Sequence, residues 1–170
     1  MTDATLDTSG PRPAVRFERQ LPQPPDAVWR ALTAPEELRV WFPCDVVAKE
    51  WKVGAPLTFL FRAHDVPALT GTVLEVDEPR LLTYTWGDEV LRFELAPHAS
   101  GGTVLVLTDE LPAGHAARNA AGWETCLARL AGQQPSDDGW RPRFDRYVTA
   151  FESTLGPQEG PPPGVDDDAT

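Results

Sequence analysis

The sequence predicts an α+β fold in which a curved antiparallel sheet of about six to seven strands packs against a long helix near the carboxyl terminus. Two observations predict this fold. Between residues 14 and 109, short stretches that alternate apolar and polar residues are separated by turn residues at hairpin spacing. From about Ala116 the apolar residues instead recur with the period of an α-helix. Because the links between successive strands are short, we expect antiparallel pairing.

The first elements are expected to be one strand and two short helices. Residues 14–20 alternate apolar and polar side chains, which is typical of a half-buried strand. The motif PPD at 24–26 places proline and an acid in the first turn of a helix. The motif TAPE at 33–36 has the pattern of a capping box, so a second helix should begin there and end near WFP at 41–43.

Hairpin-linked strands are expected next. Turn residues separate them, and Gly87-Asp88 fits a type II′ turn, which requires glycine first. The expected strands lie at 44–49, 56–62, 68–77, 80–86, 89–97 and 102–109.

The long helix should run from about Ala116 to a stop at Gly132. Its apolar stripe contains Ala120, Trp123, Leu127 and Leu130. A further amphipathic helix is expected at about 142–155, and an exposed aromatic face on it would indicate a homodimer.

These elements predict one domain with two tails. Residues 1–13 and the acidic, Pro/Gly-rich residues 156–170 have little apolar area to offset the entropy of ordering them. We therefore expect a disordered N-terminal segment at 1–13, an ordered domain at 14–155 and a disordered tail at 156–170.

Charge and composition exclude several classes of partner. The chain carries 15 Lys and Arg against 26 Asp and Glu, a net charge of -11, which argues against binding nucleic acid or an anionic membrane surface. It contains no apolar run long enough to span a membrane. The first residues do not resemble a secretory signal, so we expect a cytoplasmic protein in which Cys44 and Cys126 are reduced thiols.

Several runs resemble bacterial proteins related to the activator of Hsp90 ATPase. They are DAVWRALTAPE at 26–36, WFP at 41–43, GTVLEVDEPRLLTYTW at 71–86 and GGTVLVLT at 101–108. Gly122-Trp123, followed by Leu127 and Leu130, is similar to that family's final helix. The resemblance covers about 14–132 with the motifs in the family's order.

This resemblance implies the START-like, helix-grip fold, in which a strongly bent sheet surrounds a long C-terminal helix and a hydrophobic cavity lies between them. The chain departs from the family at one point. Many relatives carry a Thr-His pair at the end of the last strand, where this sequence has Thr108-Asp109-Glu110.

The residues expected to line such a cavity are aromatic and aliphatic side chains on the inner faces of three strands and of the long helix. They are Tyr84, Trp86, Phe93, Leu95, Leu105, Leu107, Trp123 and Leu127. No metal-ligand spacing, nucleophile elbow, Walker loop or dinucleotide motif occurs. We therefore expect no metal and no cofactor.

Three function classes remain open. The first is a binding module that holds an apolar or amphipathic small molecule, and the missing catalytic motifs favour it. The second is an enzyme of the polyketide cyclase/dehydratase kind, with acid–base catalysis by Asp109, Glu110, Arg62, Tyr84 or His64. A buried titratable group with a shifted pKa would favour this class. The third is a protein-interaction or chaperone-accessory role.

Overall fold

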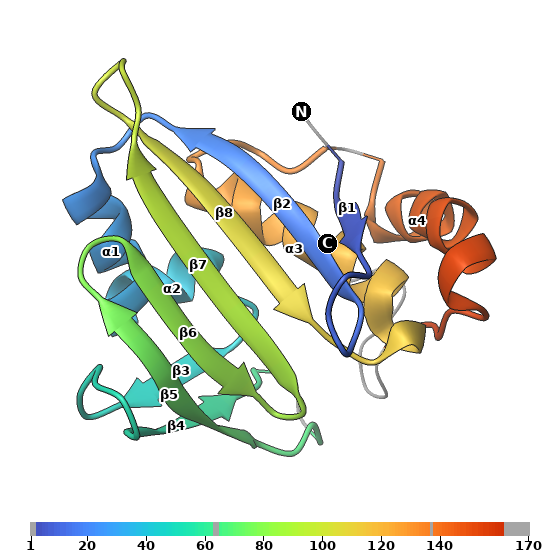
Figure 1. The fold of residues 1–170 in the computed structure, drawn as a ribbon, viewed down its shortest axis with the longest axis horizontal. Helices are drawn as coiled ribbons and strands as arrows, with labels where there is room; N and C mark the ends of the chain where they lie inside the picture. Colours follow the sequence, from blue (N-terminus) through green and yellow to red (C-terminus); the bar gives the residue numbers. More distant parts are fainter. Residues whose placement is uncertain (1–2, 63–64, 137, 162–170) are drawn as a thin grey trace.

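The computed structural model describes residues 3–62, 65–136 and 138–161. Eight antiparallel strands form an open sheet in the order β1-β2-β8-β7-β6-β5-β4-β3, with the helices on one face of it (Figure 1). The strands are β1 (Thr5–Asp7), β2 (Ala14–Leu21), β3 (Asp45–Ala48), β4 (Pro56–Leu60), β5 (Leu69–Asp77), β6 (Leu81–Trp86), β7 (Glu89–Pro97) and β8 (Thr103–Glu110). The helices are α1 (Pro25–Thr33), α2 (Pro35–Trp41), α3 (Ala116–Leu130) and α4 (Trp140–Leu155). The α+β class and the long helix are confirmed, with one strand more than the sequence indicates.

The additional strand is β1, and it corrects the expectation of disorder for residues 3–13, whereas residues 1–2 lie outside the described residues. Thr5–Asp7 pairs in register with Ala14–Arg16 of β2. The backbone N–H of Ala4 donates a hydrogen bond to the hydroxyl of Tyr147 on α4 at 3.1 Å. Backbone pairing and this contact order the segment although it has few apolar side chains.

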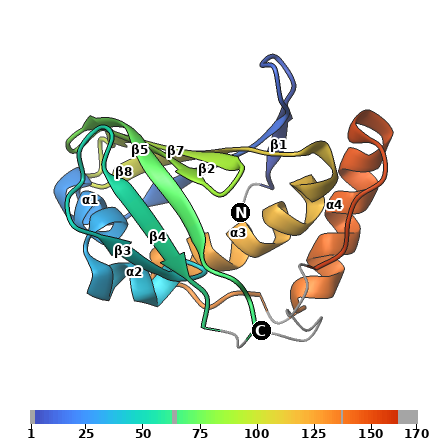
Figure 2. The same ribbon diagram turned by 90° about the horizontal axis from the view of Figure 1, so that it is seen from below.

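The sheet bends at β5. The first half of this strand pairs with β4 and its second half with β6, with a register shift between Val73 and Glu75. A Cβ atom on Gly71 would lie 2.0 Å from the carbonyl oxygen of Thr85, so only glycine allows the two strands to approach this closely. Figure 2 shows that β3 and β4 therefore curl toward the side of the sheet that carries the helices.

The short helices α1 and α2 each begin with a proline, as the sequence predicts. The expected capping box does not form. The N-cap of α2 is Ala34, which has no capping side chain, and the hydroxyl of Thr33 instead donates to the carbonyl of Trp29 at 2.9 Å. The indole N–H of Trp41 in α2 donates a hydrogen bond to the backbone carbonyl of Ala31 in α1 at 2.8 Å, which links the two helices.

Helix α4 packs against α3 (Figures 1 and 2). Its aromatic residues Phe144, Tyr147 and Phe151 are buried within the chain. Arg143 is also buried, and its guanidinium donates to the Thr125 hydroxyl of α3 at 2.7 Å. The aromatic face that could have indicated a homodimer is thus covered by the chain's own α3.

Residues 156–160, called the C-terminal strap below, correct the expectation of disorder from 156 onward. The side-chain oxygen of Gln158 accepts a hydrogen bond from the N–H of Ala117 at 2.9 Å, which caps the first turn of α3. The N–H of Glu159 donates to the carbonyl of Gly114 at 2.8 Å. Residues 162–170 of the expected tail lie outside the described residues.

Candidate functional site

The residues predicted to line a cavity all belong to the hydrophobic core or pack against it. Trp86 is half-buried and the others are buried; the full set is Tyr84, Trp86, Phe93, Leu95, Leu105, Leu107, Trp123 and Leu127. The sheet register pairs Phe93 with Leu107 and Leu95 with Leu105. Strand alternation therefore predicts the inner face correctly on β6, β7 and β8.

Aromatic rings fill much of this core. The ring centroids of Trp86 and Trp123 are 5.8 Å apart, and those of Tyr84 and Phe93 are 5.9 Å apart. Phe42, just after α2, contacts both tryptophans, at 6.0 Å from Trp86 and 5.8 Å from Trp123. These edge and tilted contacts are typical of core packing. Contact of these residues with a ligand stays a prediction.

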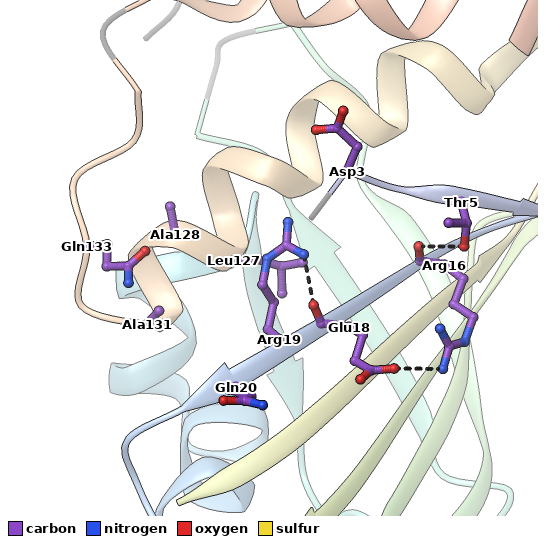
Figure 3. A pocket seen from close by; sticks show the side chains of 10 residues that line it. All are labelled: Asp3, Thr5, Arg16, Glu18, Arg19, Gln20, Leu127, Ala128, Ala131 and Gln133. Atoms are coloured by element: carbon purple, nitrogen blue, oxygen red, sulfur yellow. Dashed lines mark hydrogen bonds and ion pairs between the residues drawn. The ribbon is translucent and has the colours of Figure 1, made fainter. Parts of the chain in front are cut away.

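An open pocket lies between β2 and the C-terminal half of α3 (Figure 3). Its volume is about 640 Å³. Leu127 is the only residue of the predicted set that lines it. The lining residues are Asp3, Thr5, Arg16, Glu18, Arg19, Gln20, Leu127, Ala128, Ala131 and Gln133.

The two walls of this pocket differ in chemistry. The α3 wall is apolar and consists of Leu127, Ala128 and Ala131. The β2 wall is polar, and it is open because β1 pairs with β2 only as far as Arg16. Residues 17–21 of β2 therefore have a strand neighbour, β8, on one side only within the described residues.

A pair of buried carboxyl groups lies at the other end of α3. Asp109 of β8 is 0% exposed and Glu89, the first residue of β7, is 7% exposed. Asn119 of α3 donates from Nδ2 to both, at 2.9 Å to Glu89 Oε2 and 3.0 Å to Asp109 Oδ2. The indole N–H of Trp123 donates to Asp109 Oδ2 at 2.9 Å.

Burial holds a proton on this pair. Burial, and next the charge of Asp109, raise the pKa of Glu89 from 4.5 to about 9. Burial also raises the pKa of Asp109 to about 6, against the opposing hydrogen bonds from Trp123 and Asn119. Asp109 Oδ1 is buried and has no hydrogen-bond partner among the described residues. A hydrogen bond with the Glu89 side chain also acts to lower the pKa of Asp109, although the net shift is upward.

His115 joins this pair to the C-terminal strap. Its Nδ1 lies 3.4 Å from Glu89 Oε1 and its Nε2 lies 3.0 Å from Glu159 Oε2. Arg118 reaches the same Glu159 carboxylate at 3.4 Å. The pair is thus enclosed by β7, β8, α3 and the strap.

The remaining groups considered for catalysis are placed elsewhere. Arg62 pairs with Asp45 at the surface, at 3.1 Å, and Glu110 lies on the opposite face of β8 from Asp109. Burial raises the pKa of Tyr84 well above its usual value. His64 lies outside the described residues.

The thiols are poorly suited to nucleophilic chemistry. Burial raises the pKa of Cys44 and of Cys126 to about 12, so both stay protonated at neutral pH. Within residues 3–62, 65–136 and 138–161, no group of three His, Cys, Asp or Glu side chains is placed to hold a metal ion. No helix in those ranges is long and apolar enough to cross a membrane.

Sequence reasoning missed Glu89 and Asn119. Glu89 could have been found from the sequence. It is spaced at two-residue intervals with Leu91, Phe93 and Leu95 along the strand, so its side chain lies on the same, inner face. Asn119 gave no comparable signal, because it follows Arg118 and a pair of polar residues in a helix usually faces solvent.

Comparison with solved structures confirms the fold. Protein EF2215 from Enterococcus faecalis, described as a conserved protein of unknown function, matches with a TM-score of 0.76 at 23% identity, covering 88% of this chain and 91% of that one. CalU16 from Micromonospora echinospora matches with a TM-score of 0.68 at 19% identity, covering 90% and 94%. CV1439 from Chromobacterium violaceum matches with a TM-score of 0.59 at 27% identity, covering 75% and 100%.

Comparison with the curated proteins gives no match. The family model described as "Activator of Hsp90 ATPase homolog 1-like protein" matches residues 22–133, from the end of β2 to just beyond α3. This span contains the motifs at 26–36, 41–43, 71–86 and 101–108 on which the resemblance depends. The chain therefore belongs to the family of activator of Hsp90 ATPase homolog 1-like proteins.

Proposed function

We propose that the protein binds an amphipathic small molecule in the pocket between β2 and the C-terminal half of α3. The observation that supports this proposal is the pocket itself. It has a volume of about 640 Å³ and lies at the junction of the sheet and the long helix. Pockets for small organic ligands typically span about 300–1,000 Å³. The pocket is therefore large enough to hold such a ligand.

The lining supports an amphipathic ligand. Leu127 and Ala128 of α3 and Ala131, which follows the helix, form the apolar side of the pocket, although Leu127 and Ala128 are largely buried. Gln20 and Gln133 place amide groups at the rim, where they can pair with polar atoms of a ligand. Burial of an alkyl or aryl group on this apolar side supplies affinity, and the polar wall supplies orientation.

The enzyme alternative depends on the Glu89–Asp109 pair. A buried acid that keeps its proton near neutral pH can serve general acid–base catalysis. Both carboxyl groups are nevertheless enclosed by protein, and neither lines the pocket between β2 and α3. The arrangement therefore favours binding over catalysis as the proposed function.

Occluding the pocket tests this proposal. Gln133 is exposed at the rim, so Gln133→Trp should fill the opening without disturbing the core. Gln134→Trp is the matched control, because Gln134 is also exposed and does not line the pocket. Binding of decanol and decanoate should be followed by isothermal titration calorimetry below their aggregation concentrations.

We expect saturable one-to-one binding of at least one of the two compounds to the wild type. Gln133→Trp should weaken it by about tenfold or more, and Gln134→Trp should leave it unchanged. Absence of binding by both compounds, or binding that Gln133→Trp leaves intact, would refute the proposed function.

A further inference from the structure

Arg19 lines this pocket, and one of its guanidinium nitrogens has no hydrogen-bond partner among the described residues. It extends from β2 into the space between the strand and α3 (Figure 3). One guanidinium nitrogen, Nη1, donates to the backbone carbonyl of Glu18 at 2.9 Å. The other, Nη2, is buried and has no hydrogen-bond partner among the described residues. A buried donor without a partner is costly, so such a group needs an explanation.

The neighbouring acids are already paired with other arginines. Glu18 pairs with Arg16 at 3.2 Å. Glu124 accepts two hydrogen bonds from Arg146, at 2.8 and 3.0 Å, and Asp3 lies 3.4 Å from the same guanidinium. Within the described residues, no carboxylate lies within ion-pair distance of Arg19.

Arg19 packs against an aromatic ring and remains charged even though burial opposes its charge. Its guanidinium carbon lies 5.2 Å from the centre of the Phe17 ring. Burial lowers the pKa of Arg19, and the nearby Tyr147, Glu124 and Asp3 act in the opposite direction. Arginine remains protonated at neutral pH under such conditions.

We propose that the ligand of this pocket carries a carboxylate, which pairs with Arg19 while its apolar part lies on Leu127, Ala128 and Ala131. A carboxylate oxygen supplies the acceptor that Nη2 lacks, in the planar geometry that guanidinium groups recognise. This inference rests on the proposed function and adds the chemical class of the ligand. The apolar side of the pocket then holds an alkyl or aryl chain.

A matched pair of ligands tests the assignment. Decanoate and decanol have the same chain and differ in the head group, so their affinities for the wild-type protein separate the two contributions. We expect decanoate to bind about tenfold more tightly than decanol. Arg19→Met should remove this preference for decanoate over decanol, because methionine lacks the guanidinium group but keeps an apolar chain over Phe17.

Arg129→Met is the control, since Arg129 is an exposed arginine of α3 that does not line the pocket. It should leave the preference intact, and circular dichroism should show that both variants fold. Equal affinities of the wild type for the two compounds, or a preference that survives in Arg19→Met, would overturn the carboxylate assignment alone. Absence of binding by both compounds would refute the proposed function and this assignment together.

Discussion

The two ends of α3 differ in how accessible their polar groups are. At its N-terminal end, Glu89 and Asp109 are buried, share Asn119 as a donor and are closed off by the C-terminal strap. At its C-terminal end, Arg19 lines an open pocket, and its buried Nη2 has no hydrogen-bond partner among the described residues. Asp109 Oδ1 also lacks a hydrogen-bond partner among the described residues, so the two ends do not differ in whether every polar atom is satisfied. They differ in access, because Arg19 lines an open pocket whereas the carboxyl pair is buried and does not line that pocket.

The largest effect on stability is expected from Asn119→Ala at the closed end. Asn119 donates to both carboxyl groups, so its loss leaves two buried acceptors with fewer donors. We expect the free energy of unfolding to fall by about 3 kcal/mol in urea titrations. Arg129→Ala, at an exposed position on the same helix, should change it by less than about 0.5 kcal/mol. Equal effects of the two substitutions would show that the network contributes little.

A smaller effect, opposite in sign, is expected from Glu89→Gln. The pKa of Glu89 is raised in the folded protein from 4.5 to about 9, so the folded state holds a proton that the unfolded state releases. The stabilising contribution of this proton is complete below pH 4.5 and is lost as the pH rises to about 9. Glutamine is neutral at every pH and can donate to Asp109.

Glu89→Gln should therefore stabilise the protein by about 2 kcal/mol at pH 8 and should flatten the dependence of unfolding free energy on pH. Denaturant titrations at pH 5, 6.5 and 8 would measure this. Glu94→Gln is the control, because Glu94 lies in the same strand and its carboxylate pairs at the surface with Arg92. A wild-type stability that does not fall between pH 5 and pH 8 would contradict the account of the buried pair.

The smallest effect is expected from Gln158→Ala in the C-terminal strap. Gln158 accepts from the N–H of Ala117 and donates to the carbonyl of Ala113 at 3.0 Å, so it acts as a cap for α3. We expect a loss of about 1 kcal/mol in the free energy of unfolding, the usual cost of removing a helix cap. Glu152→Ala, at an exposed position on α4, should have little effect. A Gln158→Ala protein as stable as the wild type would show that the strap is not a structural part of the closed end.

Most of the fold could be predicted from the sequence because its signals are local. Alternation over β6, β7 and β8 placed Tyr84, Phe93 and Leu107 on the inner face, and helical spacing placed Trp123 and Leu127 opposite them. Strand β1 and the C-terminal strap could not be predicted in this way. They are ordered by hydrogen bonds to β2 and to the first turn of α3, which leave no apolar pattern in the sequence.

The candidate site was less predictable. Alternation puts Arg19 on the same face as Phe17, but the pocket also depends on where β1 stops pairing with β2. The residue at which this pairing ends depends on the tertiary structure. So does the formation of ion pairs between Arg16 and Glu18 and between Arg146 and Glu124. A sequence shows which charges are present, and only the structure shows which of them remain unpaired.

The most direct test of the contrast between the two ends is to map backbone amide chemical shifts while decanoate is added to the isotope-labelled protein. We predict that the shifted amides cluster at residues 16–20 of β2 and 127–133 in and after α3. Amides of residues 89, 109 and 115–119, at the closed end, should stay unchanged. Shifts concentrated at the closed end, with none along β2, would contradict the account.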